Sequence, residues 1–387
     1  AVATIAAASG GGLDSAATLS LTKLEHPDAT SIGLGTGALA NDDGSTNNNT
    51  AVGYQALATN VTSANNTAIG QKAMFSTICG SRNVAIGCCT LYSNTGGGSN
   101  VAIGSQAMKQ NTTGCCNVAI GPIALSSATG ATNSIVAVGW GALYSHTGPA
   151  TGSTAVGFKA LYGSTGVGAY NTAIGHCAMV CNTTGQRNVA IGYKSQCANT
   201  TGTYNASLGN GSLQLNTTGS CNVAIGHDAL LLNTVGFNTA VGVKALNANT
   251  TGCRNLAVGF HALGSNTIGS CNLAIGDCAM EKVTTGIHNV AIGYKSNRYN
   301  ITGSCNTSLG SIAAYGTQAG GNNNIIIGYA AAGSSNSASN EITLGNSSNT
   351  VFRLPGLQAG ATSGHIMCYN GTSLVLAASS GVSALDD

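Results

Sequence analysis

Fourteen cysteines are the residues of this 387-residue chain with the clearest capacity for chemistry, because thiols form disulfides and ligate metals. So many cysteines in a chain with few aromatic residues predict an oxidising environment. Two pairs, Cys181 with Cys197 and Cys253 with Cys271, are 16 and 18 residues apart. We predict that each pair forms a disulfide between two consecutive repeats. Free thiols acting as small hydrophobic side chains, and links between chains, are the alternatives.

Metal binding has a weak signal in this sequence. No Cys-x-x-Cys motif occurs, and the seven histidines are scattered. Only His176-Cys177 and His227-Asp228 bring two ligand types together, which is too few for a zinc site. We therefore expect no metal site.

Catalytic signals are also sparse, because the eleven carboxylates leave a long gap between Asp43 and Asp228. A glycosidase-like carboxylate pair is impossible within that gap. The sequence has no nucleophile-elbow, metalloprotease or phosphate-loop motif. We expect a non-enzyme without a cofactor. The alternative is a polysaccharide-degrading enzyme, for which only Asp228, Asp277 and Glu281 lie near one another.

The segments that position these residues are repeats of about 17 residues. Each repeat contains a phrase such as Asn-Val-Ala-Ile-Gly, and we call its final glycine the anchor glycine. Positions in the repeat are counted from this anchor glycine. Equivalent positions in all repeats form a column. From Gly35 to Gly345 there are nineteen anchors, so the mean interval is (345 − 35)/18, or about 17.2. The anchors are Gly35, Gly53, Gly70, Gly87, Gly104, Gly121, Gly139, Gly157, Gly175, Gly192, Gly209, Gly226, Gly242, Gly259, Gly276, Gly293, Gly310, Gly328 and Gly345.

The residues before the anchor alternate as in a short β-strand. Column −1 is always Val, Ile or Leu, column −2 is nearly always Ala, and column −3 is usually Val, Thr or Leu. Columns −3 and −1 share one face of the strand. We expect the β-branched face to pack inside and the Ala face to allow close approach of another layer.

Column −4 is Asn in fifteen of the eighteen repeats after the first. If the repeats stack, these side chains would form a ladder of amides that bond from one repeat to the next. The alternative is that they only shape turns. The predicted ladder includes Asn49, Asn66, Asn83, Asn100, Asn117, Asn171, Asn188, Asn222, Asn238, Asn255, Asn272 and Asn289.

A second glycine, such as Gly80 or Gly97, recurs at column +10. Two glycine-marked corners predict two short strands per repeat, and 17 residues leave no room for a helix as well. The repeat therefore predicts an all-β parallel β-solenoid with one coil per repeat. About eighteen coils, each rising ~4.8 Å, would span roughly 85–90 Å.

Columns +1 and +2 vary most, so we expect them to face solvent. Column +2 holds five of the eight lysines, and column +1 holds seven of the 18 aromatic residues, including the one Trp. Such a stripe could stack on sugar rings or contact a host surface, or the rings could merely cover a corner of the coil. The candidate binding stripe is Tyr54, Trp140, Phe158, Tyr193, Phe260 and Tyr294.

Asn-x-Ser/Thr sequons are frequent, and several lie in the recurring Asn-Thr-Thr phrase near a predicted corner. These asparagines are candidate glycosylation sites in a eukaryotic host: Asn60, Asn111, Asn182, Asn199, Asn216, Asn249 and Asn300.

Composition excludes several protein classes. Charged residues are only 6% of the chain, and the 13 Lys and Arg residues are not clustered, so we expect no nucleic-acid binding. No run of about 20 apolar residues occurs, so we expect no membrane-inserted helix. A coiled coil would need far more Glu and Lys.

The phrases at 188–192 and 289–293 resemble the head repeats of trimeric autotransporter adhesins, and the longer phrase at 238–252 is similar to repeats of phage and other viral fibres. The resemblance covers residues 31–345. It implies a left-handed parallel β-roll with three chains around one axis. A longer repeat than the usual adhesin unit, without a heptad stalk, favours a virion fibre or another extracellular fibre over a bacterial adhesin head. A thin coil also buries little surface alone, which favours a partner.

The chain is expected to have three parts. Residues 1–30 lack the repeat and are predicted to be an N-terminal cap or connector, and residues 31–345 are the repeat array. Residues 346–387 are predicted to be a β cap, trimerising element or assembly segment, since an open coil invites stacking. We expect an extracellular homotrimeric structural protein on a virion or cell surface. It would contact a host glycan or protein receptor and could join end to end.

Overall fold

The computed structural model describes residues 30–43, 45–129, 132–146, 152–164, 168–316, 320–335 and 337–349, and the backbone of 365–369 and 374–378. Residues 1–29 of the predicted N-terminal cap, and most of the predicted C-terminal segment, lie outside this part of the chain. The chain divides into two compact units, Ala1–Leu344 and Gly345–Asp387, and each is described by itself.

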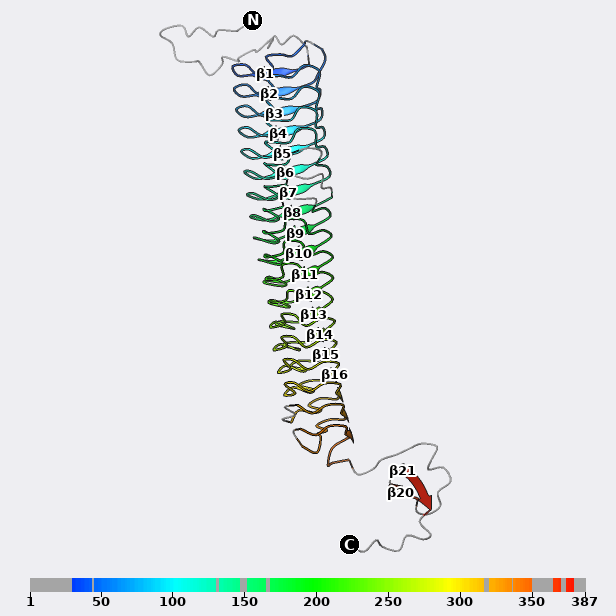
Figure 1. The fold of residues 1–387 in the computed structure, drawn as a ribbon. Helices are drawn as coiled ribbons and strands as arrows, with labels where there is room; N and C mark the ends of the chain where they lie inside the picture. Colours follow the sequence, from blue (N-terminus) through cyan, green and yellow to red (C-terminus); the bar gives the residue numbers. More distant parts are fainter. Residues whose placement is uncertain are drawn as a thin grey trace, which may run out of the picture. The chain divides into compact units, whose positions relative to one another are not determined.

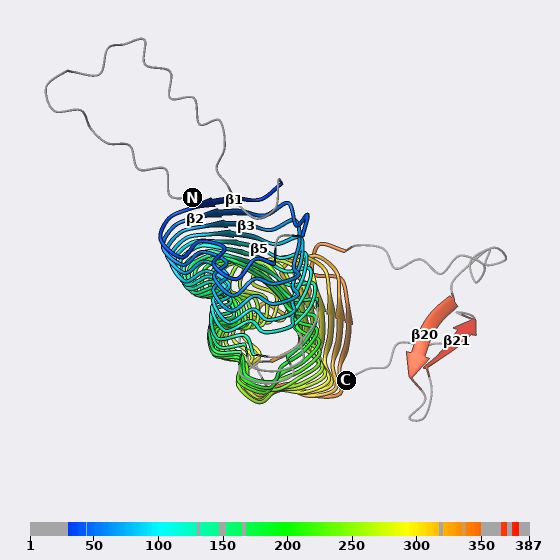
Figure 2. The same cartoon turned by 90° about the horizontal axis from the view of Figure 1, so that it is seen from above.

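The first unit is a parallel β-solenoid, as the repeat predicts. Nineteen strands form one sheet in which each strand pairs in parallel with the strand of the next coil. The pairing keeps the columns in register, so that Ala68 lies opposite Ala85. Figure 1 shows strands β1 to β16 stacked in sequence order, and Figure 2 shows successive coils nearly superimposed.

The strands are β1 (Ile32–Leu34), β2 (Thr50–Val52), β3 (Thr67–Ile69), β4 (Val84–Ile86), β5 (Val101–Ile103), β6 (Val118–Ile120), β7 (Val136–Val138), β8 (Thr154–Val156), β9 (Thr172–Ile174), β10 (Val189–Ile191), β11 (Ala206–Leu208), β12 (Val223–Ile225), β13 (Thr239–Val241), β14 (Leu256–Val258), β15 (Leu273–Ile275), β16 (Val290–Ile292), β17 (Thr307–Leu309), β18 (Ile325–Ile327) and β19 (Ile342–Leu344).

Each described coil contains one strand, so the prediction of two strands per coil is wrong. Left-handed backbone interrupts the rest of the coil at columns +2, +4 and −5, as at Lys72 (φ 54°), Met74 (φ 52°) and Arg82 (φ 62°). Such a residue costs roughly 1–2 kcal/mol. Hydrogen bonds between coils hold it, because Lys72 N–H donates to Tyr54 O at 2.8 Å and Met74 N–H donates to Thr90 O at 2.9 Å.

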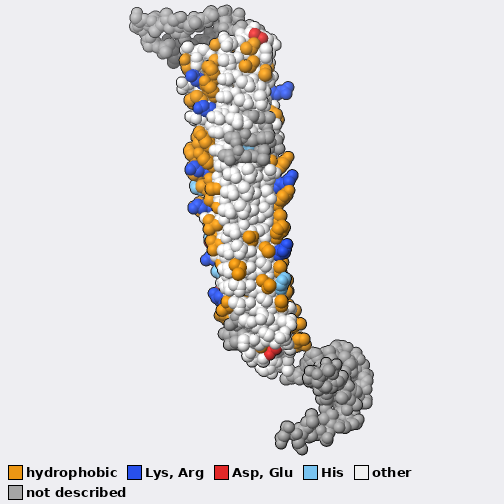
Figure 3. All heavy atoms as spheres, viewed as in Figure 1, with side chains coloured by type: hydrophobic (Ala, Val, Ile, Leu, Met, Phe, Trp, Pro, Cys, Tyr) orange, Lys and Arg blue, Asp and Glu red, His pale blue; other side chains and the backbone are white. Residues whose placement is uncertain are grey.

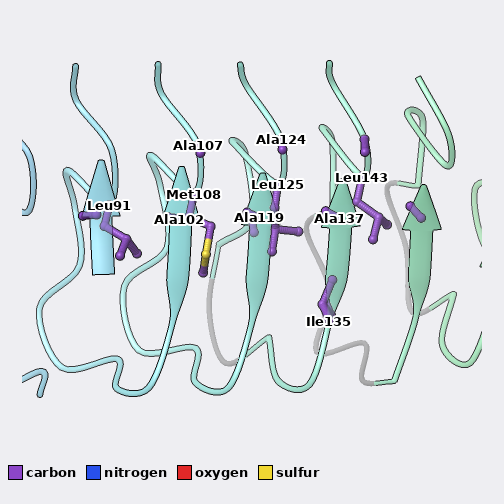
Figure 4. Packing of buried hydrophobic residues seen from close by; sticks show 14 of the residues in the cluster. Leu91, Ala102, Ala107, Met108, Ala119, Ala124, Leu125, Ile135, Ala137 and Leu143 are labelled. Atoms are coloured by element: carbon purple, nitrogen blue, oxygen red, sulfur yellow. The ribbon is translucent and has the colours of Figure 1, made fainter. Parts of the chain in front are cut away.

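The two faces of the strand are the reverse of those predicted. In β4 the middle residue Ala85 is fully buried, whereas Ile86 is 37% exposed and Val84 is partly exposed. The interior of the coil is thin, and the side chain of a Leu or Met at column +4 fills most of it. Figure 4 shows Met108 and Leu125 beside the alanines of the strands. A small inward residue, which is Ala in most strands, leaves room for these side chains, so the β-branched residues lie on the outer face.

The anchor glycine is required by both conformation and space. Gly53 has φ +134°, which is unfavourable for any residue with a Cβ. A Cβ at Gly53 would lie 2.6 Å from the carbonyl oxygen of Gly70, so a side chain would push adjacent coils apart. The same close approach recurs along the anchor column and explains its regularity.

Column −4 forms a buried ladder of asparagines. Asn83 is fully buried, its Nδ2 donates to Gly97 O at 2.9 Å, and its Oδ1 accepts the N–H of Asn100 at 2.9 Å. The amide therefore bridges its own coil and caps the next one. The equivalent N–H to Oδ1 bonds recur along the column. Ile135 and Ser153 interrupt it.

A second ladder, at column +7, contains the residues predicted to be glycosylated. Its members are fully buried: Asn60, Asn94, Asn111, Asn182, Asn199, Asn216, Asn233, Asn249, Asn266 and Asn300. Asn199 Nδ2, for example, donates to Asn182 Oδ1 at 2.9 Å and to Gly202 O at 3.2 Å. Because an N-linked glycan is attached to this nitrogen, the predicted sites Asn60, Asn111, Asn182, Asn199, Asn216, Asn249 and Asn300 cannot carry one in the folded coil.

The second unit contains a two-stranded antiparallel sheet. Strand β20 (His365–Tyr369) pairs with β21 (Leu374–Ala378), and Met367 lies opposite Leu376 in the register.

Candidate interaction surfaces

The predicted disulfides are not formed in the structure. Cys181, Cys197, Cys253 and Cys271 are all free. Their backbones are adjacent, since Cys271 N–H donates to Cys253 O at 3.0 Å. The two members of each pair nevertheless occupy different columns, so their side chains leave the backbone in different directions. Burial also raises the pKa of the Cys197 thiol, which disfavours the reactive thiolate.

The outer face of the parallel sheet is a continuous uncharged surface. It comprises columns −3 and −1 of the nineteen strands, which are 38 positions: 31 Val, Ile or Leu, six Thr and one Ala. Many of these side chains are well exposed, for example Leu208 (49%) and Ile225 (41%). We call this surface the outer sheet face. Monomeric proteins rarely expose so long an apolar strip, so it is a candidate contact surface.

The aromatic residues of column +1 lie on the surface, where the sequence places them. Tyr54, Trp140, Phe158, Tyr193, Phe260 and Tyr294 are all between 40% and 50% exposed. Four consecutive coils form a stack: the ring centroids are 5.1 Å apart for Trp140 and Phe158, 4.8 Å for Phe158 and His176, and 5.5 Å for His176 and Tyr193. His176 was not included in the predicted stripe, although its position in column +1 could have predicted that it belongs there.

Stacking limits what these rings can bind. The planes of Trp140 and Phe158 differ by 18° and those of Phe158 and His176 by 23°, so both faces of Phe158 are covered. Sugar rings stack on exposed aromatic faces. The stack therefore presents mainly ring edges to solvent, which does not suit the sugar stacking predicted for this stripe.

Lys159 lies among three aromatic rings, two from the column +1 stack and one from a neighbouring column. Its Nζ is 5.4 Å from the ring centroids of Trp140 and Phe158 and 5.3 Å from that of Tyr162. Tyr162 belongs to column +5, which also holds Tyr144 in a stacked pair with it at 5.0 Å. Aromatic residues recur in column +5 at intervals of one repeat, and this pattern could have predicted the contact, although the predictions from the sequence did not include it. Column +1, column +2 and column +5 together form one aromatic and basic corner.

Two of the described carboxylates, Glu281 and Asp228, lie in ion pairs. Glu281 accepts Arg298 Nε at 2.6 Å and Lys282 Nζ at 2.9 Å. Burial opposes ionisation, but these hydrogen bonds outweigh it and lower the pKa of Glu281 to about 2. Asp228 pairs with His227 at 3.3 Å. Among the described residues, no group of three His, Cys, Asp or Glu residues could hold a metal ion.

Comparison with protein-family models and with curated proteins finds no match to this chain. In the part of the chain that the structure describes, no helix is long and apolar enough to cross a bilayer. The interpretation of function therefore depends on the repeat and on the surfaces described above.

Proposed function

We propose that this chain is a structural, extracellular fibre protein of a virion or cell surface, and that three copies pack through the outer sheet face. The observation that carries the proposal is the regular solenoid with an uncharged apolar strip along one side. A stiff stack of equal coils projects a surface over a distance, which suits attachment or assembly. The resemblance of the repeat to adhesin heads and viral fibres supports the same role.

The size of the outer sheet face fits a stable association. Nineteen strands spaced ~4.8 Å apart make a strip about 85 Å long, and two columns make it about 10 Å wide. The resulting footprint of roughly 850 Å² is close to what each partner buries in a standard protein interface. The strip carries no charge, so burying it does not require desolvating an ion.

A polysaccharide-degrading enzyme is less well supported. General acid catalysis needs a carboxyl group that stays protonated near neutral pH. Glu281 is instead held ionised by Arg298 and Lys282.

The test is the oligomeric state of the full chain, measured by light scattering coupled to size-exclusion chromatography. We expect a mass of three chains. The double substitution Ile86→Lys with Ile225→Lys places two charges on the outer sheet face, where both residues are exposed, and is expected to give monomers.

The matched control is Ser105→Lys with Asn210→Lys. It adds the same charge at column +1, where both residues are exposed, and should leave the trimer intact. A monomeric parent protein, or loss of the trimer in both double variants, would contradict packing through the outer sheet face.

A further inference from the structure

Basic residues on the solenoid have few acidic partners along much of its length. Residues 44–227 contain six Lys or Arg residues and no Asp or Glu. Figure 3 shows Lys and Arg side chains along the edges of the solenoid, next to hydrophobic side chains. In the part of the chain that the structure describes, ion pairs join His227 to Asp228 and Glu281 to Lys282 and Arg298, so no column +2 lysine there is neutralised by a carboxylate.

The column +2 lysines rest against aromatic rings and keep their ammonium groups available. Lys194 Nζ is 5.2 Å from the ring centroid of Tyr193, and Lys295 Nζ is 4.7 Å from that of Tyr294. In each case the hydrogen bond with the tyrosine raises the pKa of the lysine, which remains a cation at any physiological pH. Packing on the rings also restricts the lysines, so less side-chain entropy is lost when a ligand binds.

The stacked rings reinforce the preference for an anion. An aromatic ring has a negative face and a positive edge. Trp140, Phe158 and His176 turn their faces toward one another, because their planes differ by only 18° and 23°. The edges that remain are positive and lie beside Lys159, which favours an anionic ligand over a neutral sugar.

The spacing of the lysines selects the kind of anion. Lys159, Lys194, Lys244 and Lys295 lie in coils that are two, three and three apart, so the charges recur about every 10–14 Å along the axis. Nucleic acids carry a phosphate about every 3.4 Å of each strand, which is far denser. A pyranose unit in an extended glycan is about as long as one coil rise. The lysines therefore match one acidic group on every second or third sugar.

We propose that the aromatic and basic corner binds an extended acidic polysaccharide that runs parallel to the solenoid axis. Carboxylate or sulfate groups of the glycan pair with successive column +2 lysines, and its uncharged sugars lie against the ring edges between them. Affinity is centred on Lys159 and Lys194, because Asp277 and Glu281 reduce the positive charge near Lys295. The proposal refines the attachment role proposed above by naming the class of ligand.

The experiment measures binding of the full chain to sodium hyaluronate, which carries one uronic acid on every second sugar, by titration calorimetry at several salt concentrations. Neutral dextran of equal length and single-stranded DNA are the comparison ligands. Substituting Lys159→Gln together with Lys194→Gln is expected to weaken hyaluronate binding about fivefold to tenfold and to flatten its salt dependence. The matched control is Arg82→Gln with Arg254→Gln, which removes equal charge at the exposed column −5.

Binding to hyaluronate that the control leaves within about twofold, with weak binding to dextran and DNA, would support the proposal. Equal losses in both double variants would show diffuse charge attraction and overturn it. Equal affinity for dextran would instead indicate ring stacking, and tighter binding to DNA would indicate a nucleic-acid surface; each overturns the proposal. Mass is measured on the same samples, so a monomer that binds hyaluronate refutes the trimer alone, and a trimer that does not bind hyaluronate refutes this inference alone.

Discussion

Two coils place an amide side chain at column +4, in the otherwise apolar part of the interior, and they differ in how completely it is hydrogen-bonded. Column +4 holds Leu, Met or Ala in the other described coils, but Gln196 and Asn297 occupy it in these two. The segments 188–196 and 289–297 share eight of nine residues, so the two sites differ little in local sequence. Each interrupts the apolar core, which is divided between Ala190 and Leu213 and again between Ala291 and Ala313.

The Gln196 layer makes a connected network. Gln196 Nε2 donates to Val189 O and to Ser207 Oγ, both at 2.8 Å. The Ser195 hydroxyl lies 2.6 Å from that of Ser207 and 3.0 Å from that of Ser212. Only the Gln196 amide oxygen lacks a partner in this group.

The Asn297 layer lacks most of these bonds. Neither amide atom of Asn297 makes a hydrogen bond within the described protein, and neither does Ser308 Oγ. Ala313 stands where the first layer has Ser212, and the amide is one methylene shorter. A single methylene and a single hydroxyl therefore decide whether a buried polar layer is satisfied, and an unsatisfied one costs stability.

The largest effect is expected from Asn297→Leu. It removes an unpaired buried amide and restores the residue type of the column, so the free energy of unfolding should rise by about 2 kcal/mol. Because solenoids can unfold locally, amide hydrogen exchange is the suitable measurement, supported by urea unfolding. It is followed in the coils that begin at β15, β16 and β17, which we call coils 15, 16 and 17 after their strands. The reverse change, Leu246→Asn, serves as the control and should destabilise its own coils by at least as much. Faster exchange in Asn297→Leu would show that the amide is satisfied in solution.

A smaller effect of opposite sign is expected from Gln196→Leu. The substitution leaves the Ser207 hydroxyl without its amide donor, so the free energy of unfolding should fall by about 1 kcal/mol. Adding Ser195→Ala and Ser207→Ala converts the layer to the residues common in these columns and should recover the loss, which urea unfolding of the parent, the single variant and the triple variant can test. If Gln196→Leu alone stabilised the protein as much as Asn297→Leu, the two layers would not differ as described.

The sequence was sufficient to predict the coil length, the parallel register and the position of the asparagine column. These follow from strict spacing, because Gly53 and its equivalents tolerate no other residue. The outward face was not predictable in the same way. Both Ala85 and Ile86 are apolar, and the choice between them depends on the Leu or Met of column +4, which enters from a left-handed turn.

Predictions from local motifs were wrong where the geometry of the coil prevents the expected modification or bond. Asn199 lies in a sequon, but the column +7 ladder buries it. Cys181 and Cys197 are one coil apart, but one column of offset keeps both thiols free. The aromatic stripe was found from its column, whereas the orientation of its rings depends on contacts between coils that no single repeat encodes.

The smallest effect concerns an ion pair that joins coils 15 and 16 outside the Asn297 layer. Arg298 of coil 16 contacts Glu281 of coil 15 at 2.6 Å, which offsets part of the weakness inside. Glu281→Gln should lower the free energy of unfolding by less than about 1 kcal/mol at pH 7. The carboxyl has a lower pKa in the folded protein, about 2, than its value of about 4.3 in an unfolded chain.

The sign of the pH dependence follows from that difference. A depressed pKa contributes stability above pH ~4.3, and this contribution is lost as the pH falls through about 2. Hydrogen exchange of coils 15 and 16 in the parent and in Glu281→Gln should therefore differ at pH 7 and converge toward pH 2. Asp228→Asn is the control, because Asp228 pairs with His227 of the same coil and joins no two coils. A difference between parent and Glu281→Gln that stayed constant with pH would mean that the pair does not hold these coils together.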